Sequence, residues 1–253
     1  MTRVLAAIDN SLAASPVLAI ARALAPLLDS DVEVLHLVEN GDRMATQAAL
    51  AAGLTLTSRR GPVIKSIIEA GRCADVAVLV VGARGTPAGP RPLGGTALAV
   101  ATGLPKPIVV VPPDAHITGV IRRVLVPVEG APAGTAPILD VVEDAELDMI
   151  VLHVYEEDSL PAFTDQPQHW QETWAREFVR RYCPWHTGPL RLETRVGRAE
   201  DLIPRVAEEV NADIIALGWT LDLGPGRAPT VHGVLDRSRR PVLLVPVAIG
   251  HPY

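Results

Sequence analysis

Four segments in the first half of this 253-residue sequence recur, in the same order, in its second half. Three of them are apolar stretches that end in an acidic residue or a proline: 3–9, 34–39 and 107–112 correspond to 123–129, 151–156 and 241–246. The fourth is a pair of glycines 21 residues apart, which is Gly61 and Gly82 in the first copy and Gly197 and Gly218 in the second. Such ordered self-similarity indicates a tandem duplication whose copies have diverged.

Short apolar runs rich in β-branched residues alternate with helical stretches in each copy. In the first copy the runs cover 3–8, 32–38, 54–58, 76–81 and 107–111. Helices are expected over 12–28, 42–52, 62–72 and 96–103, the first opening after a Ser11 cap. Runs that are apolar throughout are typical of parallel strands covered on both faces. The alternation predicts an α/β chain of two tandem doubly wound parallel-sheet domains, over residues 1–115 and 120–253.

Composition excludes several classes of protein. Hydrophobic residues make up 48% of the chain, yet no apolar run approaches the roughly 18 to 20 residues of a membrane-spanning helix. Cys73 and Cys183 form no CxxC motif, so neither a zinc framework nor a disulfide scaffold is indicated. The net charge of −6 divides into +1 for residues 1–118 and −7 for residues 119–253, so neither half is basic enough to favour nucleic acid as a partner. No secretory signal precedes the first run, and we expect a cytoplasmic protein that binds neither membrane nor nucleic acid.

A glycine-rich loop follows the fourth apolar run. Its spacing is G-x2-G-x9-G-T, with Gly82 and Gly85 at its start and Gly95 and Thr96 at its end. Glycine lets backbone approach a ligand closely, and a helix opened by Gly95 and Thr96 presents free N–H groups and the positive end of its dipole, which suit a phosphate. On composition alone, a surface turn explains the loop equally well.

Asp9 ends the first apolar run, as Gly82 ends the fourth. In a doubly wound sheet, ligands bind beyond the carboxyl ends of the strands, where the strand order reverses. If the first strand is central and the fourth lies beside it, Asp9 faces the glycine loop and can accept a hydrogen bond from a ribose hydroxyl or a base edge. The alternative role for Asp9 is a helix cap, since Asn10 and Ser11 follow it.

These residues resemble the universal stress protein family in its tandem form. The resemblance spans nearly the whole chain and is carried by residues 7–11, His36-Leu37, the Gly61-Pro62 turn and the glycine loop. It implies that the first domain holds ATP, with or without Mg²⁺, between its first and fourth strands. The residues that it implies in nucleotide contacts are Asp9, Leu37, Gly82, Gly85, Gly95, Thr96 and Ala97. Arg84 is added because it lies inside the motif and a guanidinium can reach a phosphate.

The resemblance also implies how the two domains associate. In the family, the fifth strands of two domains pair with each other. The corresponding runs here, 108–111 and 242–245, are valine-rich and suited to a sheet edge. The chain is therefore expected to form a pseudo-dimer within one polypeptide.

The second copy departs from the family pattern at its loop. Glu129 replaces the aspartate, Leu221 stands where the second glycine of the motif is expected, and Pro229-Thr230 replaces Gly95-Thr96. Proline has no N–H to offer a phosphate, and Trp219 adds bulk after the fourth strand. We expect the second copy not to hold ATP in the manner of the family.

Other patterns that could carry chemistry are weaker. The sequence contains no Walker A motif, no GxGxxG after the first strand and no G-x-S-x-G elbow. His36 and His153 lie within apolar strands and are interpreted as core or strand-end residues. Cys183 and His186 supply only two of the ligands that a metal site needs. Neither a metal site nor a catalytic residue is predicted.

An aromatic stripe distinguishes the second copy, which holds all nine aromatic residues of the chain. Trp170, Trp174, Phe178 and Tyr182 recur every four residues, as they would on one face of a helix. Packing on the sheet is the ordinary explanation of the stripe. A surface for a homodimer or a protein partner is the alternative.

Three functions fit these observations. The first is a regulatory or stress-response protein that binds one ATP in its first domain. The second is a slow ATP-hydrolysing enzyme, which is disfavoured because no general base or acceptor nucleophile accompanies the loop. The third is a scaffold without nucleotide that acts through its second domain.

Overall fold

The apolar runs of the first copy form strands, and the stretches between them form helices. The computed structural model describes residues 2–39, 41–84, 93–115, 119–128, 147–155, 190–224 and 226–247. The elements of the first half are β1 (Thr2–Ile8), α1 (Ala14–Leu24), the 3-10 helix η1 (Pro26–Leu28), β2 (Ser30–Leu37), α2 (Arg43–Ala51), β3 (Leu56–Arg59), α3 (Val63–Gly71), β4 (Val76–Gly82), α4 (Gly95–Gly103) and β5 (Ile108–Val111).

The second half repeats this order in its described part. Its elements are β6 (Arg123–Val128), β7 (Asp148–Tyr155), β8 (Leu190–Val196), α7 (Ala199–Glu209), β9 (Ile214–Trp219), α8 (Pro229–Arg237) and β10 (Val242–Pro246). Strands β6 to β10 correspond to β1 to β5, and α7 and α8 correspond to α3 and α4. The repeat seen in the sequence is therefore a repeat of structure.

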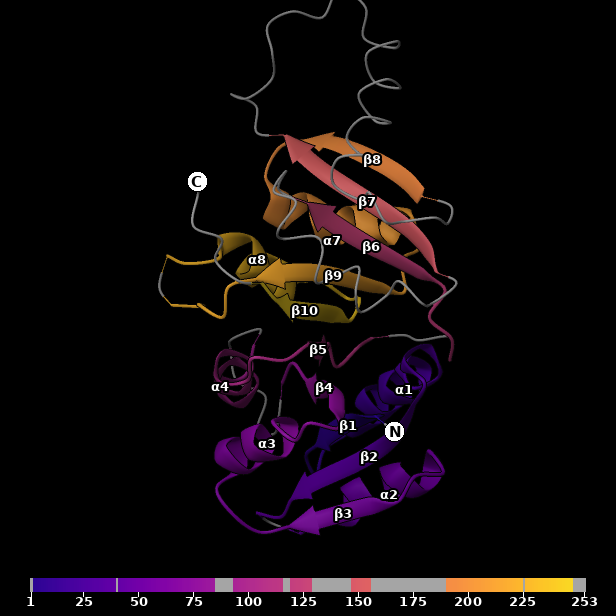
Figure 1. Ribbon diagram of the computed structural model, residues 1–253, viewed down its shortest axis with the longest axis vertical. Helices are drawn as coiled ribbons and strands as arrows, with labels where there is room; N and C mark the ends of the chain where they lie inside the picture. Colours follow the sequence, from indigo (N-terminus) through magenta and orange to yellow (C-terminus); the bar gives the residue numbers. More distant parts are fainter. Residues whose placement is uncertain are drawn as a thin grey trace, which may run out of the picture.

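The ten strands of the described residues form one sheet, in the order β3-β2-β1-β4-β5-β10-β9-β6-β7-β8. Neighbouring strands are parallel within each half, whereas β5 and β10 pair antiparallel where the halves meet. In Figure 1 the first half lies below and the second above, with β5 and β10 facing each other between them. The expected fold class, two doubly wound domains joined as an intrachain pseudo-dimer, is confirmed.

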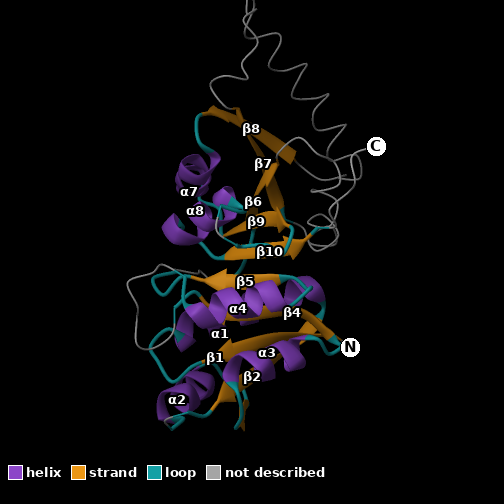
Figure 2. Ribbon diagram, turned by 90° about the vertical axis from the view of Figure 1, so that its left-hand side faces the viewer, coloured by secondary structure: helices purple, strands orange, loops and turns teal. Residues whose placement is uncertain are grey.

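In the first half, α1 and α2 cover one face of the sheet and α3 and α4 cover the other, whereas the helices described in the second half, α7 and α8, lie together on one side of their strands (Figure 2). Alternate residues of each strand point to opposite faces, so Val4 and Ala6 pack with α1 and α2, whereas Leu5 and Ala7 belong to the cluster that contains residues of α3 and α4. The second of these clusters also includes buried residues of α7 and α8. Each face thus carries one apolar core that runs through both halves.

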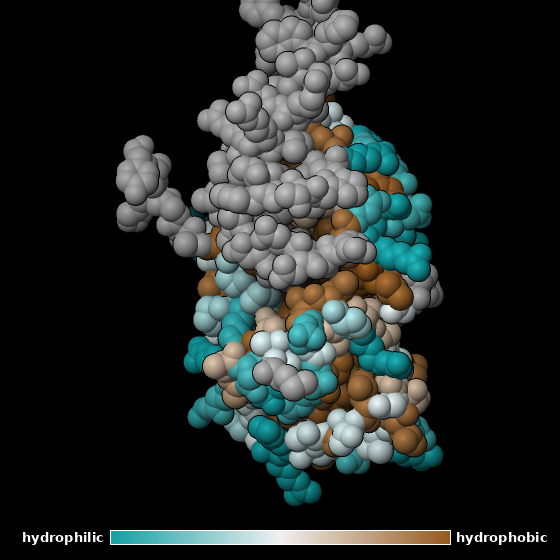
Figure 3. Space-filling view, turned by 45° about the vertical axis from the view of Figure 1, so that its right-hand side comes forward, coloured by the Kyte–Doolittle hydropathy of each residue, from teal (hydrophilic) through white to brown (hydrophobic). Residues whose placement is uncertain are grey.

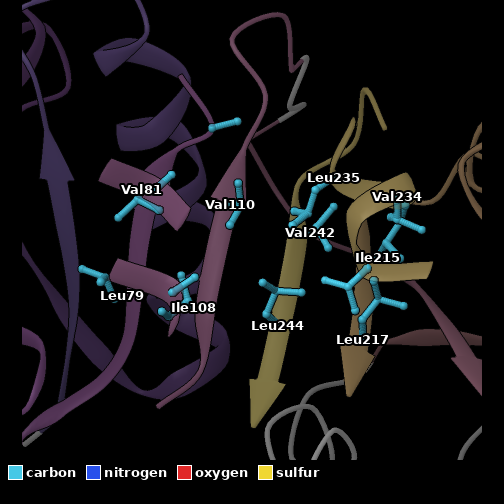
Figure 4. Packing of buried hydrophobic residues seen from close by; sticks show 14 of the residues in the cluster. Leu79, Val81, Ile108, Val110, Ile215, Leu217, Val234, Leu235, Val242 and Leu244 are labelled. Carbon is cyan, nitrogen blue, oxygen red and sulfur yellow. The ribbon is translucent and has the colours of Figure 1, made fainter. Parts of the chain in front are cut away.

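The cores are continuous because β5 and β10 are buried at the centre of the molecule. Ile108 is paired with Leu244 and Val110 with Val242, and all four side chains are at most 1% exposed. Figure 4 shows these side chains between Val81 of β4 on one side and β9 on the other. Edge strands that would otherwise expose unpaired backbone are covered by this pairing.

The first helix begins later than the sequence indicates, and the prediction that Ser11 caps it is wrong. Helix α1 starts at Ala14, its N-cap residue is Ala13, and no side chain caps it. It ends at Leu24, before Pro26, which opens η1. Proline has no N–H to continue an α-helical ladder, so the expected single helix over 12–28 is divided.

Apolar and polar side chains are mixed over the surface that Figure 3 shows for the described residues. The large apolar side chains that are exposed among these residues are Leu12, Met44, Leu50, Ile64, Val120 and Val196. Within the described part of the chain, no helix is long and apolar enough to cross a membrane.

Candidate functional site

The carboxyl ends of β1 and β4 lie side by side in the first half. β1 is placed between β2 and β4, and Ala7 pairs with Val81. The chain proceeds from β1 to β2 on one side and returns to β4 on the other, so the strand order reverses between β1 and β4. Doubly wound folds bind ligands beyond the strand ends at such a reversal. Asp9 follows β1 and Gly82 ends β4 at this point.

A cavity of about 230 Å³ opens at these strand ends. Its lining includes seven of the residues that the sequence singled out: Asp9, Leu37, Gly82, Arg84, Gly95, Thr96 and Ala97. The eighth, Gly85, lies outside the described residues. Most of the other lining residues, which the sequence did not single out, are small or apolar: Ala7, Ile8, Ala13, Ala14, Val17, Glu39, Val63, Ile67, Val81, Ala83, Gly94 and Val100. An apolar lining with a few polar groups is typical of a small-molecule site.

Helix α4 begins at the wall of this cavity. The N–H of its N-cap residue, Gly94, donates to the carbonyl oxygen of Ala83 at 2.7 Å, which holds the start of α4 against the end of β4. Gly94 has no side chain that could occupy the N–H groups of the first turn. A Cβ atom on Gly95 would meet no atom of the described residues within 4 Å. Open space beside the positive end of a helix dipole favours an anionic group at this position.

Asp9 lines the same cavity, and its carboxylate is held by the turn that follows β1. The hydroxyl of Ser11 donates to Oδ1 of Asp9 at 2.5 Å. The same hydroxyl oxygen accepts the N–H of Ala13 at 3.1 Å. Ser11 therefore orders the turn after β1 instead of capping α1, and Asp9 is not the helix cap that was its alternative role. The turn keeps the carboxylate at the cavity wall.

Asn10 fastens this turn to α2, a role that sequence reasoning missed. Its side-chain oxygen accepts the N–H groups of Met44 and Ala45 at 2.7 and 3.2 Å. These N–H groups belong to the first turn of α2, where an asparagine oxygen is a favoured partner. Asparagine is a residue type that often caps helices, but the sequence does not show which helix Asn10 caps, because Met44 lies 34 residues away.

His36 is buried at the end of β2, with 2% of its surface exposed. Its Nδ1 atom lies 3.0 Å from the carbonyl oxygen of Ile8, and its Nε2 atom lies 3.2 Å from that of Gly41. The expected strand-end position of His36 agrees with this placement. The residue also joins β1 to the segment that follows β2.

The matching region of the second half has larger side chains. Trp219 and Val231 stand where the first half has Ala83 and Ala97, and Trp219 is only 3% exposed. Helix α8 begins at Pro229, whose nitrogen carries no hydrogen, and its N-cap residue Ala228 has a left-handed backbone (φ 44°). In the preceding loop, Oδ1 of Asp222 accepts the N–H of Gly224 at 2.9 Å. The expectation that the second copy does not hold ATP in the manner of the family stays a prediction.

His153 takes the place of His36 in the second half. Its Nδ1 atom lies 3.0 Å from the carbonyl oxygen of Val128, and its ring meets that of Tyr155 edge to face, with the centroids 4.5 Å apart. Burial raises the pKa of Tyr155 to about 12.

Several residues singled out in the sequence lie outside the described part of the chain. They are Glu129, Trp170, Trp174, Phe178, Tyr182, Cys183 and His186. The prediction of a partner surface on the aromatic stripe therefore stays a prediction. Among the described residues, no group of three or more His, Cys, Asp or Glu side chains could hold a metal ion.

Residues 121–246 match the model of the universal stress protein family. The chain therefore belongs to this family, and the match falls on the half whose loop departs most from the glycine motif. No curated protein matches the chain.

Solved structures resemble the whole chain in fold. A protein of unknown function from Pseudomonas aeruginosa PAO1 is 18% identical, with a TM-score of 0.67 over 98% of this chain and 93% of its own. A putative universal stress protein from Pseudomonas aeruginosa UCBPP-PA14 is 17% identical, with a TM-score of 0.67 over 98% and 94%. A universal stress protein from Archaeoglobus fulgidus is 18% identical, with a TM-score of 0.65 over 98% and 97%. The ten-stranded arrangement is thus a recurring architecture.

Proposed function

We propose that this protein is a nucleotide-dependent regulatory or stress-response protein that binds one ATP in the cavity between β1 and β4. The observation that carries the proposal is that Asp9 and the first residues of α4 line the same cavity. A carboxylate and the N-terminus of a helix in one cavity match the two ends of a nucleotide, which are a sugar with hydroxyl donors and an anionic phosphate chain.

The wall residues divide between these two ends. Asp9 accepts a hydrogen bond from a ribose hydroxyl or a base edge, and the adenine ring lies near Leu37. The phosphates lie against the glycine loop and the first turn of α4, with contacts from Gly82, Gly85, Gly95, Thr96 and Ala97. Arg84, which lines the same cavity, adds positive charge near the phosphates.

Mg²⁺ would enter with the phosphates in this proposal. Magnesium in nucleotide sites is held by one or two carboxylates together with phosphate oxygens and water. The cavity lining offers Asp9 and Glu39 as carboxylates. Nucleotide affinity measured with and without the ion tests this part separately.

We also propose that the domain limits are 1–115 and 120–253, with the nucleotide in the first domain only. Strand β5 ends at Val111 and β6 begins at Arg123, so both limits fall between these strands. The bulk of Trp219 and the missing N–H of Pro229 support the restriction to one site.

Nucleotide content is the experiment that tests the function. Protein purified without added nucleotide is denatured, the released small molecules are identified by chromatography, and stripped protein is titrated with ATP by calorimetry. We expect about one adenine nucleotide per chain. Protein that neither contains nor binds nucleotide would contradict the proposal, and rapid ATP turnover with Mg²⁺ would favour an enzyme instead.

A further inference from the structure

His36 is a buried titratable residue to which the proposed function assigns no role. Both of its ring nitrogens lie close to backbone carbonyl oxygens, those of Ile8 and Gly41, at 3.0 and 3.2 Å. A carbonyl oxygen can only accept a hydrogen bond. Each ring nitrogen must therefore carry a hydrogen for both bonds to form.

Only the imidazolium form of histidine has a hydrogen on both nitrogens. A neutral ring would donate to one carbonyl and turn a lone pair toward the other. Because the ring is 2% exposed, solvent cannot easily supply the missing donor. The geometry thus suits protonated His36, and loss of the proton removes one of two bonds.

Both bonds end next to walls of the cavity. Ile8 precedes Asp9, and Gly41 lies shortly after Glu39, while Leu37 follows His36 itself. All three of these neighbouring side chains, Asp9, Leu37 and Glu39, line the cavity. Protonated His36 therefore connects the end of β1 to the loop after β2 through two hydrogen bonds, and both segments form this side of the site.

The segments around His36 carry charged residues of both signs. These segments are β1 and the turn after it, the loop after β2, the start of α2, and β3, which pairs with β2 through Ser58. Their charged residues nearest in sequence to the contacts of His36 are Asp9, Glu39, Asp42, Arg43 and Arg59. Helix α1, which covers the same face, carries Arg22 in its last turn, at the opposite end of the strands.

We infer that His36 is a positioning residue that couples occupation of the nucleotide cavity to a proton. The inference rests on the proposed function. Protonated His36 holds both walls and places a positive charge beside a site for an anionic ligand, so the occupied state binds the proton more tightly than the empty state. By linkage, nucleotide affinity falls as the pH rises through the range in which His36 loses its proton.

The second half supplies a matched control. His153 makes the same 3.0 Å contact between Nδ1 and the last carbonyl of its neighbouring strand, that of Val128. It lies in the half to which no nucleotide is assigned. A His153→Gln substitution removes an equivalent strand-end histidine without touching the proposed site.

The test compares the pH dependence of ATP affinity in three proteins: wild type, His36→Gln and His153→Gln. Calorimetric titrations between pH 5.5 and 8.5 give the ratio of the Kd values at the two limits. Titration of the ATP phosphates contributes equally to all three proteins and cancels between them. We expect the ratio for wild type to exceed that for His36→Gln by about fivefold, which is at the low end of usual site-to-site coupling. His153→Gln should match wild type.

A second measurement needs no variant, so a poorly folded His36→Gln protein does not defeat the test. Nitrogen-15 NMR of the histidine rings in wild type reports whether His36 carries one or two hydrogens. We expect two hydrogens, retained to higher pH when ATP is bound. Equal pH ratios in wild type and His36→Gln, or a singly protonated ring at pH 5.5, would overturn the inference and leave ATP binding standing. Absence of ATP binding at every pH would instead refute the proposed function, and the inference with it.

Discussion

Val110 of β5 pairs with Val242 of β10, and this antiparallel contact joins two parallel half-sheets into one. Both residues are 1% exposed. Apolar side chains of β4, β5, β9, β10 and α8 pack together around the contact (Figure 4). Because this junction is packed like the interior of a domain, we expect the two halves to unfold as one cooperative unit.

Energetic coupling between Ile108 and Leu244 tests this cooperativity. The two residues are partners across the junction and are fully buried. Replacing either with alanine should lower the free energy of unfolding by about 2 to 4 kcal/mol, through lost burial and a residual cavity. The double variant should deviate from the sum of the single changes by about 0.5 kcal/mol or more, because the residues are in contact.

The control for this double-mutant comparison is the pair Leu35 and Leu244, which are not in contact. Leu35 is equally buried and belongs to the same core cluster, but β2 is separated from β10 by three strands. Their alanine variants should therefore be additive within about 0.5 kcal/mol. Chemical denaturation of all variants supplies the numbers. Two separate unfolding transitions would show that the junction does not couple the halves.

Gly233 in α8 is expected to tolerate no side chain. A Cβ atom there would overlap the Cβ of Glu200 in α7, an atom fixed close to the backbone. Alanine is normally the better helix former by about 1 kcal/mol, yet overpacking at this contact should outweigh that gain. We expect Gly233→Ala to lower the free energy of unfolding by about 1 to 2 kcal/mol, measured by urea denaturation.

Gly103 in α4 is the control for Gly233. A Cβ atom there would approach Cδ1 of Ile68 at 2.5 Å, and that atom is the far end of a flexible side chain that can rotate away. Gly103→Ala should therefore cost less than Gly233→Ala. A larger loss for Gly103→Ala would mean that the close approach of α7 and α8 is less rigid than the structure indicates.

The sequence predicted the two half-sheets because their strands are apolar throughout and recur in order. It could not supply the long-range hydrogen bonds that shape the site. Ser11 is a common helix cap by residue type, but its hydroxyl is taken by Asp9 two residues earlier. Asn10 caps α2 from a loop that is distant in sequence, so a local sequence pattern cannot predict that contact.

The expected site residues lie together because of the sheet topology, and the chemistry of their side chains contributes less to this placement. Asp9 and Gly82 meet because parallel strands end at the same edge, which the alternating pattern of strands and helices already implied. Glu39 and Val63 also line the cavity but were not anticipated. An isolated glutamate after a strand and a valine that opens a helix have ordinary explanations in any α/β chain. Val63 is placed at the cavity by the packing of α3, and Glu39 by the pairing of β2 with β1.

Glu193 of β8 should make stability depend on acid pH. Burial by itself raises the pKa of this carboxyl group, but hydrogen bonds and charge from Arg195 and Arg191 together hold the pKa below its usual value. The stabilisation is therefore present above the pKa of an unfolded glutamate, about 4.3, and is lost as the pH falls through the lower folded value. Glu193→Gln removes the charge and should destabilise the protein at pH 7.

Thermal denaturation at pH 7 and at pH 3 checks this prediction. The difference in Tm between wild type and Glu193→Gln should be larger at pH 7 than at pH 3, because part of the stabilisation by the ionised carboxylate is lost once the pH falls below the unfolded pKa of about 4.3. Glu69 pairs with Lys65 on the surface at 3.7 Å, with both side chains well exposed. Glu69→Gln is therefore the control and should change Tm little at either pH. The same pH dependence in both variants would contradict a specific role for Glu193.

A negative charge at Gly95 should abolish nucleotide binding without unfolding the protein. Because a Cβ atom at this position meets no described neighbour within 4 Å, we expect a larger side chain to be accommodated without unfolding. A carboxylate on Gly95→Asp would stand among the phosphates and should raise the Kd for ATP at least about tenfold, which corresponds to about 1.4 kcal/mol. Gly95→Ala, which adds the Cβ atom without charge, should weaken binding less.

Pro229→Asp places the same charge at the corresponding position of the second half. Pro229 is the first residue of α8, where an aspartate is compatible with the helix dipole, so the variant should fold. Its ATP affinity and nucleotide content should equal those of wild type, as calorimetry and chromatography of extracted nucleotide can show. An equal loss from Gly95→Asp and Pro229→Asp would contradict the assignment of one site to the first half, because a single site beside α4 cannot respond to a charge placed at α8.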